Sequence, residues 1–117
     1  MNYKKGDIVV VKFPFVLRNG SEIQKGRPAL VIADDRVKRR YNDIILSAIT
    51  SQIPDELMEL EILIDSSKET GLIKQSLLRL DFIMTIPEYL VSRKIGRLPH
   101  DILKRTNSKI KKSLGII

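Results

Sequence analysis

Arginine and hydroxyl side chains are the groups of this sequence best suited to chemistry. Arg27 follows a glycine-containing polar run and precedes Pro28 at the mouth of an apolar segment, and Thr50 ends a second apolar segment. Arg79 and Asp81 lie two residues apart in a third apolar segment, so their side chains share one face if that segment is a strand. A guanidinium makes two parallel hydrogen bonds to a phosphate and stabilises charge that develops on its oxygens. These residue types favour chemistry on a phosphate, although an arginine and an aspartate on one strand face also form ordinary surface ion pairs.

Several other kinds of catalytic site lack the residues they need. The chain has no cysteine, which excludes a disulfide framework and a thiolate nucleophile. His100 is the single histidine, so neither a histidine pair nor an HExxH metal site is present, and we expect it to face solvent at the start of a helix. Asp34 and Asp35 are adjacent and would point to opposite faces of a strand, which argues against a shared metal. We therefore expect no metal and no other cofactor.

The charge is unevenly distributed along the chain. The 117 residues carry a net charge of +7, whereas the segment 51–69 has six acidic residues against one lysine. A basic excess favours polyanionic partners such as nucleic acid. The acidic segment suggests a polarised surface, with a solvated acidic loop and strand as the simpler alternative. No apolar run approaches the length of a membrane span and no signal-peptide pattern opens the chain, so we expect a cytoplasmic protein without a membrane partner.

Short strands must position these side chains. β-branched and apolar runs predict strands at 7–13, 29–33, 43–49 and 76–84, and alternation favours another within 57–64. Residues 18–26 resemble a polar connection between strands. In the strand at 76–84, alternation predicts one face with Leu78, Leu80 and Phe82 and the other with Leu77, Arg79 and Asp81.

The C-terminal part of the chain has the pattern of a helix. Pro99 suits the first turn and Gly115 the position just past the end. The predicted apolar stripe consists of Ile102, Leu103, Thr106, Ile110 and Leu114. About five strands and a terminal helix with short connections predict a single domain, 1–117, that is mainly β and forms a small barrel or half-barrel.

Five blocks in this order resemble the MazF/PemK (Kid) toxins of type II toxin–antitoxin systems. They are Asp7–Phe15, Gly26–Ile32, Leu46–Ser51, Arg79–Asp81 and Arg93–Leu98. The resemblance spans almost the whole chain. It implies an SH3-like barrel with a C-terminal helix (the CcdB/MazF-like toxin fold), a homodimer, and sequence-selective cleavage of single-stranded RNA, chiefly mRNA. It also implies a cognate antitoxin, which we expect to be acidic and partly disordered.

The resemblance also implies which residues act. In MazF-like members the catalytic pair falls on Arg27 and Thr50, and in Kid-like members on Arg79 and Asp81. Kid also uses a histidine in its first loop, where this sequence has none between Leu17 and Glu22. We therefore rank Arg27 and Thr50 above Arg79 and Asp81 as the catalytic pair. The hypothesis is attack by the RNA 2′-OH on the adjacent phosphate, which yields a 2′,3′-cyclic phosphate and a 5′-OH end without a metal.

Loops that splay bases and read their edges are expected to select the RNA sequence. The RNA-binding candidates are Arg18, Lys25, Arg36, Lys38, Arg39, Arg40, Tyr41 and Ser51. A solvated basic turn is the alternative for the run 36–41. Two rival functions remain on the same scaffold: a CcdB-like toxin that binds gyrase without cutting RNA, and an inert SH3-like nucleic-acid-binding module. Arg27 together with Thr50 favours the nuclease.

Overall fold

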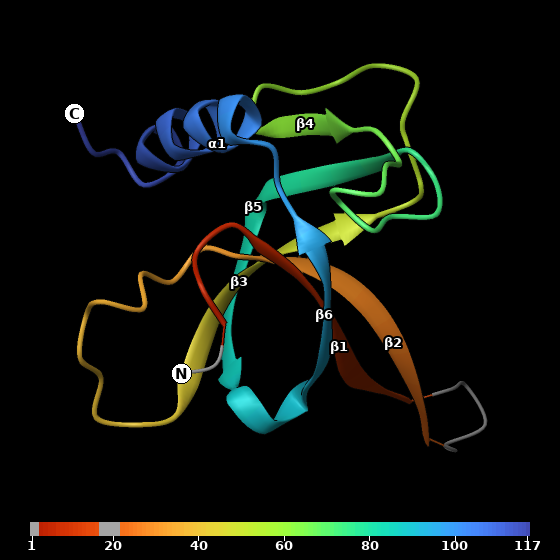
Figure 1. Ribbon diagram of the computed structural model, residues 1–117. Helices are drawn as coiled ribbons and strands as arrows, with labels where there is room; N and C mark the ends of the chain where they lie inside the picture. The colour runs from red at the N-terminus through yellow and green to blue at the C-terminus, as the bar shows by residue number, and fades with distance from the viewer. Residues whose placement is uncertain (1–2, 17–21) are drawn as a thin grey trace.

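The structure, a computed structural model, describes residues 3–16 and 22–117, without the side chains of residues 13–16 and 22–25. Within these residues one antiparallel sheet of six strands has the order β4-β5-β3-β2-β1-β6, and a helix packs against it (Figure 1). The elements are β1 (Asp7–Val16), β2 (Glu22–Val31), β3 (Asp43–Thr50), β4 (Glu61–Ile64), β5 (Ser76–Pro87), the 3-10 helix η1 (Glu88–Leu90), β6 (Val91–Arg97) and α1 (His100–Ser113). The predicted class, mainly β with a C-terminal helix, is confirmed.

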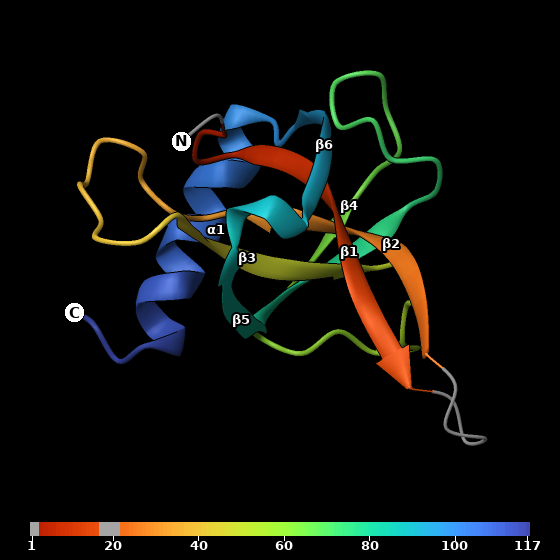
Figure 2. The ribbon, with the colours of Figure 1, turned by 90° about the horizontal axis from the view of Figure 1, so that it is seen from below.

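The sheet is strongly curved, and β5 bends sharply within it (Figures 1 and 2). Ala48 of β3 pairs with Arg79, whereas the adjacent Ser47 pairs with Ile83, so residues 80–82 are extra in β5. An insertion of this kind bends a strand and increases its twist. The first part of β5 pairs with β4, and the remainder follows β3 toward η1. The edge strands β4 and β6 are not neighbours in the sheet order, so the small barrel stays open.

Apolar side chains cover both faces of the central strands. One cluster packs between the sheet and α1 and includes Ile8, Leu30, Ile49, Ile62, Leu78 and Leu80, with Ile102, Leu103 and Ile110 of the helix against it. The second lies on the other face and includes Val9, Val11, Val31, Ile44, Leu46 and Ile86. Burying each of these larger side chains contributes about 1.5–3 kcal/mol. The continuous apolar run predicted as a strand at 43–49 is therefore buried on both faces.

The structure differs from the predicted elements in several places, apart from small shifts of strand ends. Residues 22–26, predicted as part of a loop, belong to β2 because they pair with β1. Residues 57–60 form a turn, and only 61–64 are a strand. β6 (Val91–Arg97) and η1 were not predicted as elements. In β5 the expected alternation fails, because Leu77 on the predicted polar face is buried and Phe82 at the bend is exposed.

The helix begins and ends close to where the sequence predicts. Gly115 has a φ of +70°, a conformation that suits glycine just past a helix end. Thr106 is fully buried in the middle of the stripe, and its Oγ1 donates to the carbonyl of Ile102. Leu114, which the stripe included, is exposed because the helix has already ended. His100 is exposed at the first position of α1, as expected.

Candidate active site

Arg27 and Thr50 lie on adjacent strands at matching positions. Ala29 of β2 pairs with Ala48 of β3, and extending this antiparallel register by two residues brings Arg27 opposite Thr50. These two residues lie just beyond the last paired position of the two strands. Pro28 has no N–H for a neighbouring strand, and pairing of β2 with β3 begins only at Ala29. Arg27 is therefore exposed where the two strands separate.

The hydroxyl of Thr50 is fixed by the turn that ends β3. Its Oγ1 accepts a hydrogen bond from the backbone N–H of Gln52 at 3.1 Å. A hydroxyl has one proton and two lone pairs, so this contact leaves the proton to donate to a phosphate oxygen. The side chain is half-buried, with its oxygen at the border of a groove.

This groove, of about 460 Å³, lies between the end of β3 and the first part of β5. Its lining consists of Thr50, Gln52, Ile53, Pro54, Glu61, Leu77 and Arg79. In the sheet, Thr50 pairs with Leu77, and Arg79 pairs with both Ala48 and Glu61, so these residues form two consecutive rows on one face. Thr50 and Arg79 thus share one groove, whereas Arg27 belongs to β2, two residues before its first pair with β3.

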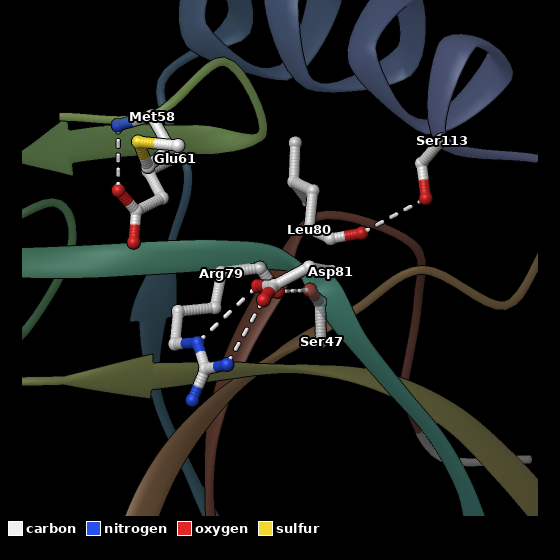
Figure 3. A network of polar contacts seen from close by, with 7 residues as sticks. All are labelled: Ser47, Met58, Glu61, Arg79, Leu80, Asp81 and Ser113. Atoms are coloured by element: carbon white, nitrogen blue, oxygen red, sulfur yellow. Dashed lines mark hydrogen bonds and ion pairs between the residues drawn. The ribbon is translucent and has the colours of Figure 1, made fainter.

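Arg79 and Asp81 form a two-pronged ion pair in this region (Figure 3). Nε and Nη2 of Arg79 donate to the two carboxylate oxygens of Asp81 at 3.2 and 2.9 Å. The hydrogen bond raises the pKa of Arg79 and lowers the pKa of Asp81, with Glu61 adding a smaller upward contribution at Arg79. A general acid or base works best with a pKa near the working pH. Pairing moves both groups away from that range, so the pair is unsuited to proton transfer.

Two serines outside the sequence-predicted site hold the bend of β5. Fully buried Ser47 of β3 donates to the carbonyl of Arg79 at 2.5 Å, and Ser113 of α1 donates to the carbonyl of Leu80 at 3.2 Å (Figure 3). These contacts satisfy carbonyls at the point where the bulge disrupts the ladder. No local signal in the sequence marks either serine, because both act on residues more than 30 positions away.

The other predicted RNA contacts lie elsewhere. Ser51 lines a second groove, of about 300 Å³, together with Pro28 and Arg93, instead of the groove at Thr50. The run 36–41 belongs to the loop before β3, which projects from the end of the sheet opposite Thr50 (Figures 1 and 2). The eight residues of β3 put this loop about 23 Å from Thr50.

The individual members of this loop differ in their contacts. Arg36 is held by Asp34 through two side-chain hydrogen bonds of 2.8 and 3.0 Å, which lower the pKa of Asp34 and raise that of Arg36. Lys38, Arg39 and Arg40 are exposed, as is Tyr41. Two further candidates are not described: Arg18 lies outside the described residues, and Lys25 lies in β2 with its side chain outside the described part.

The described residues hold neither a cluster of metal-ligating side chains nor a helix suited to a membrane. Within residues 3–16 and 22–117, no group of three or more histidine, cysteine or acidic side chains is arranged to hold a metal ion. Over the same residues, no helix has the length and apolar composition that crossing a membrane would require.

Comparison with known proteins shows the class of protein to which this fold belongs. The fold matches that of an endoribonuclease solved in complex with its cognate antitoxin from a mycobacterial species, with a TM-score of 0.76, 12% identity, and 98% of this chain and 97% of the other covered. Residues 4–114 match the family described as PemK-like, MazF-like toxin of type II toxin–antitoxin system. The chain belongs to this toxin family.

Two curated relatives match this chain over nearly their whole length. One is the probable endoribonuclease MazF of Mycolicibacterium smegmatis, 30% identical over 113 residues, with 97% of each chain covered. The other is the endoribonuclease EndoA of Bacillus subtilis, 31% identical over 117 residues, with 100% of this chain and 98% of the relative covered. The family expected from the five sequence blocks is therefore confirmed.

Proposed function

We propose that this protein is a toxin endoribonuclease that cuts single-stranded RNA, chiefly mRNA, at selected sequences and without a metal. The observation that carries the proposal is that Arg27 and Thr50 each lie two residues beyond the last paired position of β2 and β3, with Thr50 lining a groove. An arginine beside a hydroxyl provides two kinds of donor to a phosphate from rigid strands. Membership of the PemK-like, MazF-like family supports the same assignment.

In the proposed reaction the 2′-oxygen of the RNA attacks the adjacent phosphorus. The new O2′–P bond forms as the P–O5′ bond breaks, which leaves a 2′,3′-cyclic phosphate. The 2′-hydroxyl loses its proton and the departing 5′-oxygen gains one, so the second product ends in a 5′-OH. Arg27 stabilises the negative charge on the phosphorane oxygens, a role that suits a planar, positively charged guanidinium. Thr50 donates its free proton to a phosphate oxygen and fixes the position of the phosphate.

Arg79 and Asp81 are second-rank candidates for the reaction itself, because their mutual pairing disfavours proton transfer. Ser51 and Lys25 are proposed to contact RNA near the cut, and Arg18 in the first loop is proposed to do the same. Lys38, Arg39, Arg40 and Tyr41, together with Arg36, can contact only nucleotides well away from the phosphate at Thr50.

The test uses a long single-stranded RNA, EDTA and mapping of the cut ends. We expect defined cuts with 5′-OH ends in the wild-type protein and a loss on the order of 100-fold or more in Arg27→Ala. Arg105→Ala, which removes an exposed arginine of α1, is the matched control and should cut at the wild-type rate.

A single 2′-deoxy nucleotide at the cut site should abolish cleavage while binding persists. Efficient cutting of an all-DNA analogue would contradict the mechanism. Wild-type cutting by Arg27→Ala would contradict the role of that residue.

We further propose that the chain acts as a single toxin domain over 1–117, as a cytoplasmic homodimer, and that a cognate antitoxin neutralises it. The solved mycobacterial endoribonuclease in complex with its antitoxin supports the antitoxin. An acidic, partly disordered antitoxin suits a chain with a net charge of +7. The family match lends no support to the gyrase-binding toxin or the inert binding module.

A further inference from the structure

We infer that the groove between Thr50 and Arg79 binds an unpaired nucleobase of the RNA, and that Glu61 selects a base that carries an exocyclic amino group. This inference rests on the proposed endoribonuclease function. It assigns the groove a role in sequence choice and leaves the reacting phosphate to Arg27 and Thr50.

The composition of the groove fits a base. Ile53, Pro54 and Leu77 supply apolar walls, and Gln52 supplies an amide that both donates and accepts hydrogen bonds. Small-molecule sites have this make-up, with apolar surfaces for ring faces and a few polar groups for the edges. Single-stranded RNA is recognised in the same way, through unstacked bases whose edges are hydrogen-bonded.

The charges of the groove disfavour a phosphate. Arg79 is the only cation among the described residues that line it, and Asp81 already occupies Nε and Nη2 of that guanidinium. Glu61 adds a negative charge directly opposite Arg79 in the β4–β5 ladder. The group of Glu61, Arg79 and Asp81 therefore carries a net negative charge, which disfavours a phosphate on the Arg79 side of the groove, away from Thr50, and leaves a neutral base unaffected.

The polar groups are also fixed in place, as recognition of one base requires. The guanidinium of Arg79 lies 5.3 Å from the centre of the Phe82 ring, and Ser47 holds the backbone carbonyl of Arg79. Oε1 of Glu61 accepts from the backbone N–H of Met58 at 2.7 Å, and the side chain extends from β4 toward β5 (Figure 3). Oε2 remains as an acceptor for a donor on the ligand.

The chemistry of Glu61 determines which bases fit. An ionised carboxylate only accepts hydrogen bonds, so it favours an edge with an amino group. Adenine, cytosine and guanine carry an exocyclic amino group, whereas uracil does not. We therefore expect uracil to be disfavoured at one position next to the cut.

The test is Glu61→Gln, which preserves the acceptor for Met58 and replaces the other oxygen with a donor. Cleavage of a random-sequence RNA pool with sequencing of the 5′-OH ends gives the base preference at each position. We expect the preference at one position to shift toward bases that present a carbonyl, and the best wild-type substrate to be cut roughly 10-fold more slowly. Glu56→Gln removes the same charge from an exposed side chain outside the groove lining and should keep the wild-type pattern.

A second measurement does not depend on the folding of a variant. An abasic nucleotide at the selected position should slow cleavage by the wild-type protein about 10-fold, and should slow Glu61→Gln much less. An unchanged base preference in Glu61→Gln, or an equal loss on every sequence, would overturn the inference while the proposed function stands. A wild-type protein that leaves the whole pool uncut would overturn both.

Discussion

At the residue scale, the Arg79–Asp81 pair bears on our proposal that the groove recognises a base while Arg27 and Thr50 act on the phosphate. Two hydrogen bonds join the side chains. Both remain partly exposed, with 38% of the side-chain surface of Arg79 and 45% of that of Asp81 accessible. At this exposure the pair adds little to stability. Its structural effect is to hold the guanidinium in one orientation beside the groove, a property useful for reading a base.

The pKa directions of this pair make a prediction for the rate of cleavage. Because Arg79 lowers the pKa of Asp81 below its ordinary value of 3.8, the carboxylate stays ionised at all higher pH and takes up a proton only in stronger acid. Asp81→Asn should therefore leave the shape of the pH–rate profile unchanged between about pH 5 and pH 8. The measurement is single-turnover cleavage of one defined RNA. Loss of an ionisation step in the variant would show that Asp81 transfers a proton.

At the element scale, β6 depends on close backbone packing against the segment 65–71. The N–H of Arg97 donates to the carbonyl of Glu69 at 2.7 Å, and buried Thr70 ties the segment together through its hydroxyl. A Cβ added at Gly96 would lie 2.3 Å from the carbonyl of Thr70, and one at Gly71 would lie 2.0 Å from the carbonyl of Ile95. Both glycines are required because two backbones meet there without room for a side chain.

Gly96→Ala is therefore expected to lower the free energy of unfolding by about 3 kcal/mol or more. The added Cβ would clash with the backbone carbonyl of Thr70, which cannot rotate away as a side chain can. Gly115→Ala is the matched control: its φ of +70° is also unfavourable for alanine, but no atom lies within 4 Å of the added Cβ, so we expect a loss of about 1 kcal/mol. Urea denaturation measures both. Equal small losses would show that β6 can move away from the segment 65–71.

At the scale of the whole molecule, the acidic segment is set against a basic remainder. Glu59 forms an ion pair with Lys112 of α1, and Lys109 donates to the carbonyl of Glu59. The helix thus holds the middle of the acidic segment, whose N-terminal part lines the groove through Gln52, Ile53 and Pro54. The net charge of +7 therefore overstates the attraction of this region for RNA.

Affinity for RNA should follow the number of phosphates actually contacted. For single strands, the logarithm of the binding constant falls with the logarithm of salt concentration by about 0.7 per neutralised phosphate. We expect Arg27→Ala to reduce this slope by about 0.7, and Arg105→Ala on the outer side of α1 to leave it unchanged. The measurement is the Kd of an uncut oligonucleotide with a 2′-deoxy cut site, over about 50 to 200 mM salt. Equal slopes in all three proteins would show that Arg27 does not contact a phosphate.

The sequence by itself determined the class of fold, most of the strands, the C-terminal helix and the family. Its patterns are local, since β-branched runs, Pro99 and Gly115 act within a few residues. It did not reveal β6, where glycine and charged residues interrupt the apolar pattern and pairing with β1 supplies the stability. Nor did it reveal that residues 22–26 extend a strand, because their partners lie in β1.

The arrangement of the site was decided only by the tertiary structure. Arg27, Thr50 and Arg79 were predicted from the sequence, but the register of three strands sets their neighbours and separates them from the loop at 36–41. The bend of β5 at residues 80–82 is held by hydrogen bonds from Ser47 and Ser113, which lie in distant parts of the chain. Such contacts depend on hydrogen bonds between segments far apart in sequence, which local residue patterns do not encode.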